Sequence, residues 1–160
     1  MEKFGIGQPV TRVEDQRFTR GAGTYIEDVS LDNETVGVFV RSPHAHARIV
    51  EINKDSINKL PGILAVYSGE DLRIDSIGDI PCGAEINNID GTPCVKPRRP
   101  ALAIDRVRHL GDAVALIVAE TKQQALDAAD QLWIDYEPLD VAVETESSLS
   151  AEAPHIWDEA

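Results

Sequence analysis

His44 and His46 are the residues whose type and spacing best suit a metal ion. In an extended backbone, residues two apart point to the same side, so both imidazoles could reach one ion. A structural zinc site usually needs four protein ligands, and a catalytic site needs three and a water. The other histidines, His109 and His155, lie beside no further group of ligands. The sequence therefore favours a turn with solvated or hydrogen-bonded imidazoles over a shared metal.

Cys82 and Cys94 are the only thiols, and they do not form a Cys-x-x-Cys pair. They lie in a segment rich in glycine and proline. A labile disulfide, a shared metal ion and two unreacted thiols are all compatible with this spacing. A reducing cytosol favours the unreacted thiols.

No other motif predicts catalysis or cofactor binding. The glycine pairs in 5–7 and 21–23 neither follow a strand nor open a helix, which a dinucleotide-binding loop requires. The sequence has no Gly-x-Ser-x-Gly and no His-Glu-x-x-His, and no carboxylate pair stands out in an apolar setting. The residues by themselves predict no catalytic, cofactor-binding or metal-binding residue.

The composition is that of a soluble, acidic, globular chain. With 160 residues, 42% of them hydrophobic, the chain can form one compact domain with a buried core. No apolar run has the length of a membrane span, and the N-terminus lacks the apolar region of a secretory signal. The net charge of −13 argues against binding a phosphate backbone. We expect a cytoplasmic protein that binds no nucleic acid and has no membrane span.

The segment 106–139 is predicted to form a strand, a helix and a second strand. Apolar side chains occupy both faces of residues 113–119, as in a strand covered on both sides. Thr121, followed three places on by Gln124, predicts a capping box at the start of the helix. Helical spacing continues in the apolar residues Ala125, Leu126, Ala129 and Leu132. Residues 133–136 form the returning strand, which would complete a right-handed crossover if the two strands were parallel.

A shorter strand, helix and strand are predicted in the first half of the chain. Residues 36–42 and 47–52 have the pattern of strands. Two strands this close are either antiparallel neighbours or one strand broken by a bend. A short helix over 54–60 and a strand over 63–67 follow, with a proline and a glycine between them.

Two segments without regular periodicity carry the expected contacts with a partner. The N-terminal arm alternates its charges between residues 11 and 20, as a segment does when it lies on another surface. An arm packed on its own domain is the alternative. The loop 77–100 is of a length that is usually functional, mobile or covered by a partner, and a dense cationic cluster lies at its end. The candidate interface residues are Arg12, Glu14, Asp15, Arg17, Arg20, Lys96, Arg98 and Arg99.

These patterns divide the chain into an arm over 1–30, an α/β domain over 31–146 and a linker over 147–160. The linker is polar and acidic, and it leaves Ile156 and Trp157 without an element around them. We therefore expect the natural chain to continue beyond Ala160.

Four stretches, in one order, carry a resemblance to a known family. They are residues 7–28 (GQPVTRVEDQRFTRGAGTYIED), 40–49 (VRSPHAHARI), 60–67 (LPGILAVY) and 107–139. Together they resemble the start of the large, molybdopterin-binding subunit of the molybdenum hydroxylases: xanthine dehydrogenase, aldehyde oxidase and aerobic carbon monoxide dehydrogenase. The resemblance implies the family's hammerhead domain, of α/β (α+β) class, with a mixed β-sheet and two strand–helix–strand units.

The resemblance also implies a role in a larger enzyme. Such an enzyme hydroxylates a carbon centre with oxygen from water and passes electrons through iron–sulfur clusters to flavin. The family's catalytic glutamate and molybdopterin ligands lie in later domains, so none of them transfers to a residue of this chain. The start at Met1 resembles the split forms, in which separate chains carry iron–sulfur clusters and FAD. The arm resembles the carbon monoxide dehydrogenase-like branch. The expected partners are the downstream molybdopterin-binding domains and these two subunits, and the expected role is packing and assembly.

The sequence departs from the family pattern in the 109–113 segment. The family often has Gly-Glu-Pro where this chain has Gly111, Asp112 and Ala113, and an aromatic residue where it has His109. Both departures are compatible with a structural segment. A free-standing interaction module on the same scaffold remains an alternative, as does a small metal-binding protein that uses the histidine pair and the cysteines.

Overall fold

The computed structural model describes residues 11–158, and the chain divides into two compact units, residues 1–34 and 35–160. In the first unit the described residues form the short helix α1 (Asp15–Phe18) and the 3-10 turn η1 (Ile26–Asp28). The backbone N–H of Tyr25 donates to the Asp28 carboxylate at 2.9 Å and closes η1. The glycine pair of residues 5–7 and the start of the predicted arm lie outside the described residues.

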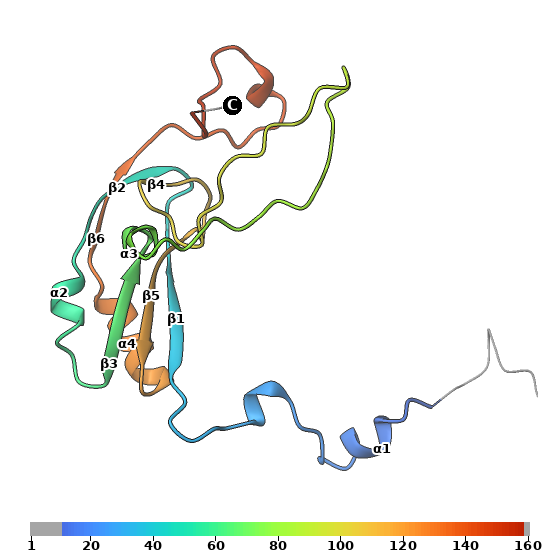
Figure 1. Ribbon diagram of the computed structural model, residues 1–160, viewed down its shortest axis with the longest axis vertical. Helices are drawn as coiled ribbons and strands as arrows, with labels where there is room; N and C mark the ends of the chain where they lie inside the picture. Colours follow the sequence, from blue (N-terminus) through green and yellow to red (C-terminus); the bar gives the residue numbers. More distant parts are fainter. Residues whose placement is uncertain (1–10, 159–160) are drawn as a thin grey trace, which may run out of the picture. The chain divides into compact units, whose positions relative to one another are not determined.

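The second unit is built on two three-stranded sheets (Figure 1). The first has the order β1-β5-β3, with β1 (Val36–Arg41), β5 (Ala113–Ala119) and β3 (Ile63–Ser68). The second has the order β4-β2-β6, with β4 (Arg106–Val107), β2 (Ala47–Ile52) and β6 (Ile134–Pro138). The helices are α2 (Lys54–Ile57), α3 (Gly69–Ile74) and α4 (Lys122–Gln131), and the 3-10 turn η2 (Ser147–Leu149) follows. No helix in residues 11–158 has the length and apolar character needed to cross a membrane.

The predicted α/β class is confirmed, but the strands pair differently from the mixed sheet expected. Every strand pair among the described residues is antiparallel. The predicted strand, helix and strand of 106–139 form as β5, α4 and β6, yet β5 and β6 lie in different sheets. The reason is that β1 and β3 already occupy both edges of β5, so β6 pairs with β2 instead.

The two closely spaced strands of the first half are separated by a bend. β1 and β2 belong to different sheets, which excludes the alternative of antiparallel neighbours. Ser42 organises the bend, since its hydroxyl donates to the His44 carbonyl at 3.1 Å and accepts from the His44 N–H at 2.9 Å. The Ser42 N–H donates to the Asp112 carbonyl at 2.8 Å, and the Gly111 N–H donates to the Ser42 carbonyl at 2.9 Å. The bend is therefore held to the turn that precedes β5.

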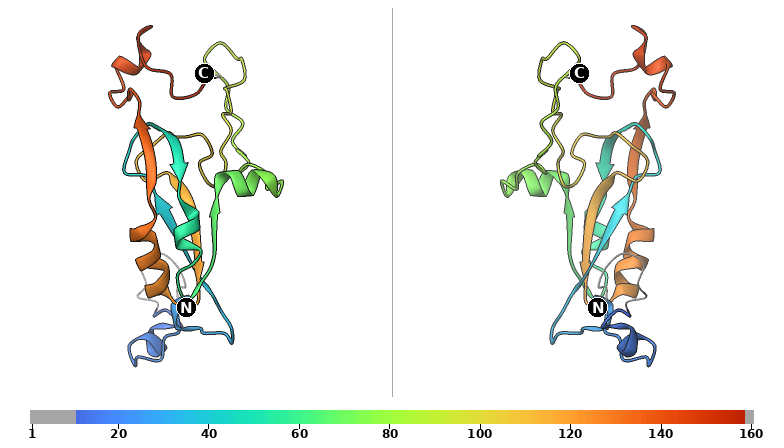
Figure 2. Two further views of the ribbon diagram at one scale, coloured as in Figure 1. Left: turned by 90° about the vertical axis from the view of Figure 1, so that its left-hand side faces the viewer. Right: turned by 90° about the vertical axis from the view of Figure 1, so that its right-hand side faces the viewer.

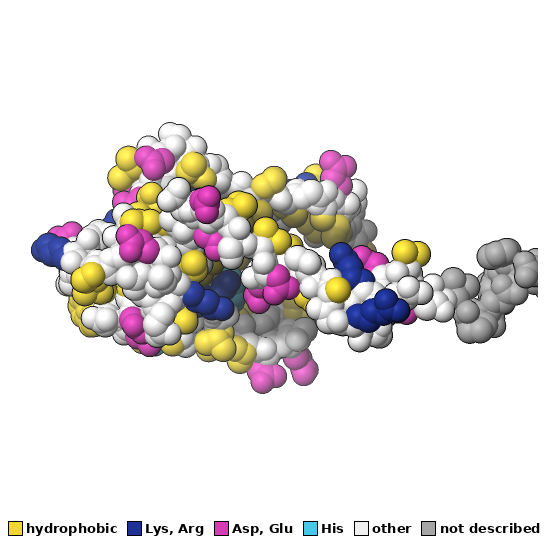
Figure 3. Space-filling view, turned by 90° about the horizontal axis from the view of Figure 1, so that it is seen from below, with side chains coloured by type: hydrophobic (Ala, Val, Ile, Leu, Met, Phe, Trp, Pro, Cys, Tyr) yellow, Lys and Arg dark blue, Asp and Glu magenta, His cyan; other side chains and the backbone are white. Residues whose placement is uncertain are grey.

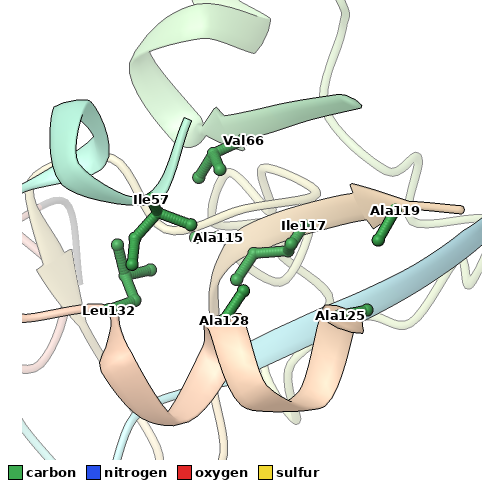
Figure 4. Close-up of a cluster of buried hydrophobic side chains, with 8 residues drawn as sticks. All are labelled: Ile57, Val66, Ala115, Ile117, Ala119, Ala125, Ala128 and Leu132. Carbon is green, nitrogen blue, oxygen red and sulfur yellow. The ribbon is translucent and has the colours of Figure 1, made fainter. Parts of the chain in front are cut away.

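Helix α4 covers one face of the first sheet (Figure 4). Its buried residues are Ala125 and Ala128, and their small side chains lie close to Ile117 of β5. The Thr121 hydroxyl caps the helix: it accepts from the Gln124 N–H at 3.3 Å and donates to the Gln124 side-chain oxygen at 2.8 Å. Leu126, which the periodicity placed on the buried stripe, is 41% exposed.

The opposite face of the first sheet stays largely uncovered. Phe39 of β1 and Tyr67 of β3 flank Leu116 of β5 in register, and this row points away from the core beneath α4. Phe39 and Tyr67, at the two ends of the row, are 49% and 38% exposed. Figure 2 shows α4 on one side of this sheet and the short helix α3 on the other side, beside the end of β3.

A half-buried carboxylate ties α2, β3 and α3 together. Asp71 accepts hydrogen bonds from the backbone N–H and hydroxyl of Ser68, both at 2.6 Å, and pairs with the Lys54 ammonium. Burial raises the pKa of Asp71, but the hydrogen bonds from Lys54 and Ser68 outweigh it and lower this pKa from 3.8 to about 2. The charged form of Asp71 is therefore part of the folded state.

We predict that Asp71→Asn lowers the free energy of unfolding at neutral pH by about 1 to 2 kcal/mol, after allowance for partial exposure of the pair. Because folding depresses the pKa, the stabilisation is complete above the unfolded value and is lost as the pH falls from about 4 towards 2. Urea unfolding of the wild type and the variant between about pH 7 and pH 3 measures this. Asp75→Asn, at the exposed end of the same helix, is the control. A stability difference between Asp71→Asn and the wild type that does not shrink with falling pH would contradict the prediction.

Candidate functional site

The two histidines first considered as metal ligands hold structural positions at the β1–β2 bend. His46 is buried, and its Nδ1 donates to the Asp140 carbonyl at 2.7 Å. The His44 ring packs on Tyr136 with 5.0 Å between centroids. Across residues 11–158, no three His, Cys, Asp or Glu side chains are grouped as a metal site would require. The His46 bond instead connects the bend to the segment that follows β6.

Cys82 and Cys94 are free thiols within a long loop that leaves the two sheets (Figure 1). Cys82 is exposed, and the Cys94 thiol donates to the Asn88 side-chain oxygen at 3.2 Å. A single antiparallel bridge between Asn87 and Pro93 is the regular pairing described in this loop. The loop returns to the sheets through a contact from the Ile80 N–H to the Arg99 carbonyl at 2.7 Å.

Two adjoining hollows form where the end of this loop meets the 101–113 segment and the C-terminal tail, residues 150–158. The larger has a volume of about 460 Å³ and the smaller about 290 Å³, and Pro100, Arg108 and Trp157 line both. Six of the chain's 15 lysine and arginine residues line the pair: Arg41, Arg73, Arg98, Arg99, Arg106 and Arg108. Figure 3 shows another view of the surface, on which hydrophobic, acidic and basic side chains are interspersed. An acidic chain thus gathers its positive charge around one site.

Asp105 lies between two of these arginines. Its carboxylate is 3.2 Å from Arg106 Nε and 3.5 Å from Arg108 Nη2. Burial raises the pKa of Asp105, but the charges of Arg108 and Arg106 outweigh it, so the pKa lies below its usual value. Asp105 therefore stays ionised and pairs with both guanidinium groups beside the hollows.

The tail closes onto the same two arginines. The Arg108 guanidinium lies 4.3 Å from the centroid of the Trp157 ring, and Asp158 is 3.3 Å from Arg106 Nη1. Trp157 had no predicted element around it, because no local pattern connects it to Arg108, far earlier in the chain. The alternation of Arg106 and Arg108, which places both side chains on one side of an extended segment, was the signal available.

The predicted interface residues fall into two groups. In the first unit, Arg12 pairs with Asp15 at 3.3 Å and Arg17 with Glu14 at 2.8 Å, so these charges are partly matched within the arm. In the second unit, Arg98 pairs with Asp79 at 2.7 Å and lines the smaller hollow, while Arg99 lines the larger one. The structure joins Arg98 and Arg99 to four arginines that the sequence analysis did not select: Arg41, Arg73, Arg106 and Arg108. Arg20 and Lys96 line neither hollow.

We predict that Trp157→Ala frees the tail without unfolding the sheets. A cation–π contact of this kind is worth about 0.5 to 2 kcal/mol, so amide exchange over 150–158 should become roughly 2 to 30 times faster. Hydrogen exchange read by mass spectrometry measures this. Trp133→Ala, at a half-exposed site between α4 and β6, is the control and should leave tail exchange unchanged. Unchanged exchange of the tail in Trp157→Ala would show that the stacking does not hold it.

Comparisons with known proteins place these features in a wider context. A family model described as "Aldehyde oxidase and xanthine dehydrogenase, a/b hammerhead domain" matches residues 20–140. The carbon monoxide dehydrogenase large chain of Afipia carboxidovorans is 37% identical over 94% of this chain and 17% of its own. The nicotine 6-hydroxylase large subunit of Paenarthrobacter nicotinovorans is 33% identical over 90% of this chain and 17% of its own.

Solved structures agree. The reconstituted CO dehydrogenase from Oligotropha carboxidovorans superposes with a TM-score of 0.80 at 37% identity, covering 94% of this chain and 17% of its own. Quinoline 2-oxidoreductase from Pseudomonas putida 86 superposes with a TM-score of 0.77 at 34% identity, covering 95% and 19%. The chain therefore spans less than a fifth of the proteins that it matches.

Proposed function

The chain belongs to the aldehyde oxidase and xanthine dehydrogenase a/b hammerhead family, and we propose that it is the N-terminal structural domain of the large subunit of a molybdenum-dependent hydroxylase. One observation carries this proposal: almost the whole chain aligns with 17% of a carbon monoxide dehydrogenase large chain. The rest of such a chain would supply the catalytic domains. The whole enzyme would be an oxidoreductase that hydroxylates a carbon centre with oxygen from water.

In this proposal the domain packs and assembles but does no chemistry. The proposal assigns the molybdopterin cofactor to the rest of the large chain, since this chain aligns with only 17% of such a chain. The partners are those domains and two further subunits, one with iron–sulfur clusters and one with FAD. The names of several relatives, "large subunit" and "complex subunit gamma", support an assembly of several chains. A cytoplasmic location is also part of the proposal.

The size of the native polypeptide tests the proposal. An antibody raised to these residues should detect a band several times larger than 17.5 kDa in the source cell. That polypeptide should co-purify with two smaller chains and with molybdenum, measured by elemental analysis. A band at 17.5 kDa without molybdenum would refute the enzyme proposal and favour a free-standing interaction module.

Charge reversal tests the interface. We predict that Arg98→Glu combined with Arg99→Glu weakens co-purification of the smaller chains, because both side chains lie at the mouth of the hollows rather than in a core. Placing like charges opposite each other across an interface commonly lowers the affinity by about tenfold or more. Lys122→Glu, on the exposed start of α4, is the control. If thermal stability of the 160-residue chain falls as much as assembly does, the two arginines are internal rather than interfacial.

The arm residues Arg12, Glu14, Asp15, Arg17 and Arg20, with Lys96, remain proposed contacts of the same kind.

A further inference from the structure

The larger hollow is continuous with the uncovered face of the first sheet. Phe39 and Arg41 of β1 and Ala113 of β5 line the hollow, and Phe39 also begins the exposed row with Leu116 and Tyr67. We refer to this row together with the larger hollow as the arginine–aromatic surface. It combines an apolar strip with a cationic cavity on one side of the second unit.

The apolar strip is a row of side chains on three neighbouring strands. Strand pairing holds Phe39, Leu116 and Tyr67 in register across β1, β5 and β3. The next row, Gly37, Val118 and Ala65, carries small or partly buried side chains. Phe39 is 49% exposed and Tyr67 38% exposed. A bound partner would remove this apolar area from water.

The cavity has an excess of positive charge. Four arginines line it, Arg41, Arg99, Arg106 and Arg108, against the single carboxylate of Asp112. Asp105 pairs with both Arg106 and Arg108, and Asp158 pairs with Arg106. Arg41 donates to the Gly111 carbonyl at 2.9 Å, and its guanidinium lies 5.8 Å from the Phe39 ring. Within residues 11–158, neither Arg41 nor Arg99 forms an ion pair with a carboxylate.

The contacts of the tail show which chemical groups two of these arginines bind. An aromatic residue, Trp157, stacks on Arg108, and the adjacent acid, Asp158, pairs with Arg106. The same two-part recognition is available beside it, where Phe39 supplies the apolar contact and Arg41 and Arg99 supply the charge. Arginine forks bind carboxylates in two-point geometry and add specificity to the contact.

We propose that the arginine–aromatic surface binds an acidic segment of a partner subunit, in which carboxylates stand next to apolar side chains. The carboxylates pair with Arg41 and Arg99, and the apolar side chains pack on Phe39, Leu116 and Tyr67. A polypeptide fits better than a free small anion because the apolar strip extends the contact beyond the cavity. Aromatic residues and arginine are also the types that contribute most to protein interfaces. This inference rests on the proposed function, since the partner is another subunit of the same enzyme.

Carbodiimide coupling of the assembled enzyme tests the surface. Arg99→Lys keeps the positive charge and introduces a primary amine, which carbodiimide joins to a carboxylate only in direct contact. Mass spectrometry should find Lys at position 99 linked to an Asp or Glu of a partner subunit, within an acidic segment that contains apolar residues. Arg41→Lys should link to the same segment. Phe39→Ser in the Arg99→Lys enzyme should lower the yield of this link by roughly tenfold, because an apolar anchor is lost.

Lys122 serves as the internal control for random coupling, since it is exposed at the start of α4. Links from position 99 only to carboxylates of this chain, such as Asp112, or no link at all, would overturn the inference. Molybdenum content and subunit composition of the same sample separate the two proposals. An enzyme with molybdenum and partner chains but no link refutes the surface alone. A sample without partner chains refutes the proposed function and the surface with it.

Discussion

Pairing along both edges of β5 holds the second unit together. β1 and β3 hydrogen-bond to its two sides, and its alternate residues enter two cores. Ala115, Ile117 and Ala119 pack beneath α4, whereas Val114 joins Ala47, Ala103 and Val107 between the sheets. Because both edges are occupied, β6 and β2 must form a separate sheet, and the chain must bend between β1 and β2. The two-sheet architecture follows from this one strand.

Electrostatics imposes a second constraint. The chain carries a net charge of −13, yet six of its arginines surround one pair of hollows. Like charges gathered this closely repel one another, and Asp105 and Asp158 offset that repulsion only in part. Of these six, Arg41 and Arg99 form no ion pair with a carboxylate of residues 11–158, and they lie beside the uncovered strip of the first sheet. Charge and exposed apolar area therefore coincide, which a domain designed only for its own stability would not require.

A structural domain and a docking surface are consistent roles for this chain. Two polar groups hold the fold: the half-buried Asp71 joins α2 to α3, and the buried His46 joins the bend to the segment after β6. At the hollows, Asp105 and the stacked Trp157 hold the partly buried Arg106 and Arg108 in position. A rigid set of arginines costs less side-chain entropy on binding than a set of mobile lysines, so such a surface suits specific assembly.

The sequence by itself determined the local elements and the family. The apolar pattern of 113–119, the Thr121 cap and the helix after it, and the strands of the first half all correspond to elements of the structure, because each depends on residues a few positions apart. Four stretches in order also predicted the family, which the match over 20–140 confirms. The partners of each strand, the shift of the buried stripe on α4 and the arginine–aromatic surface came only from the tertiary structure. These depend on which edges of β5 are free and on contacts such as Arg108 with Trp157, which join distant parts of the chain and leave no local periodic signal.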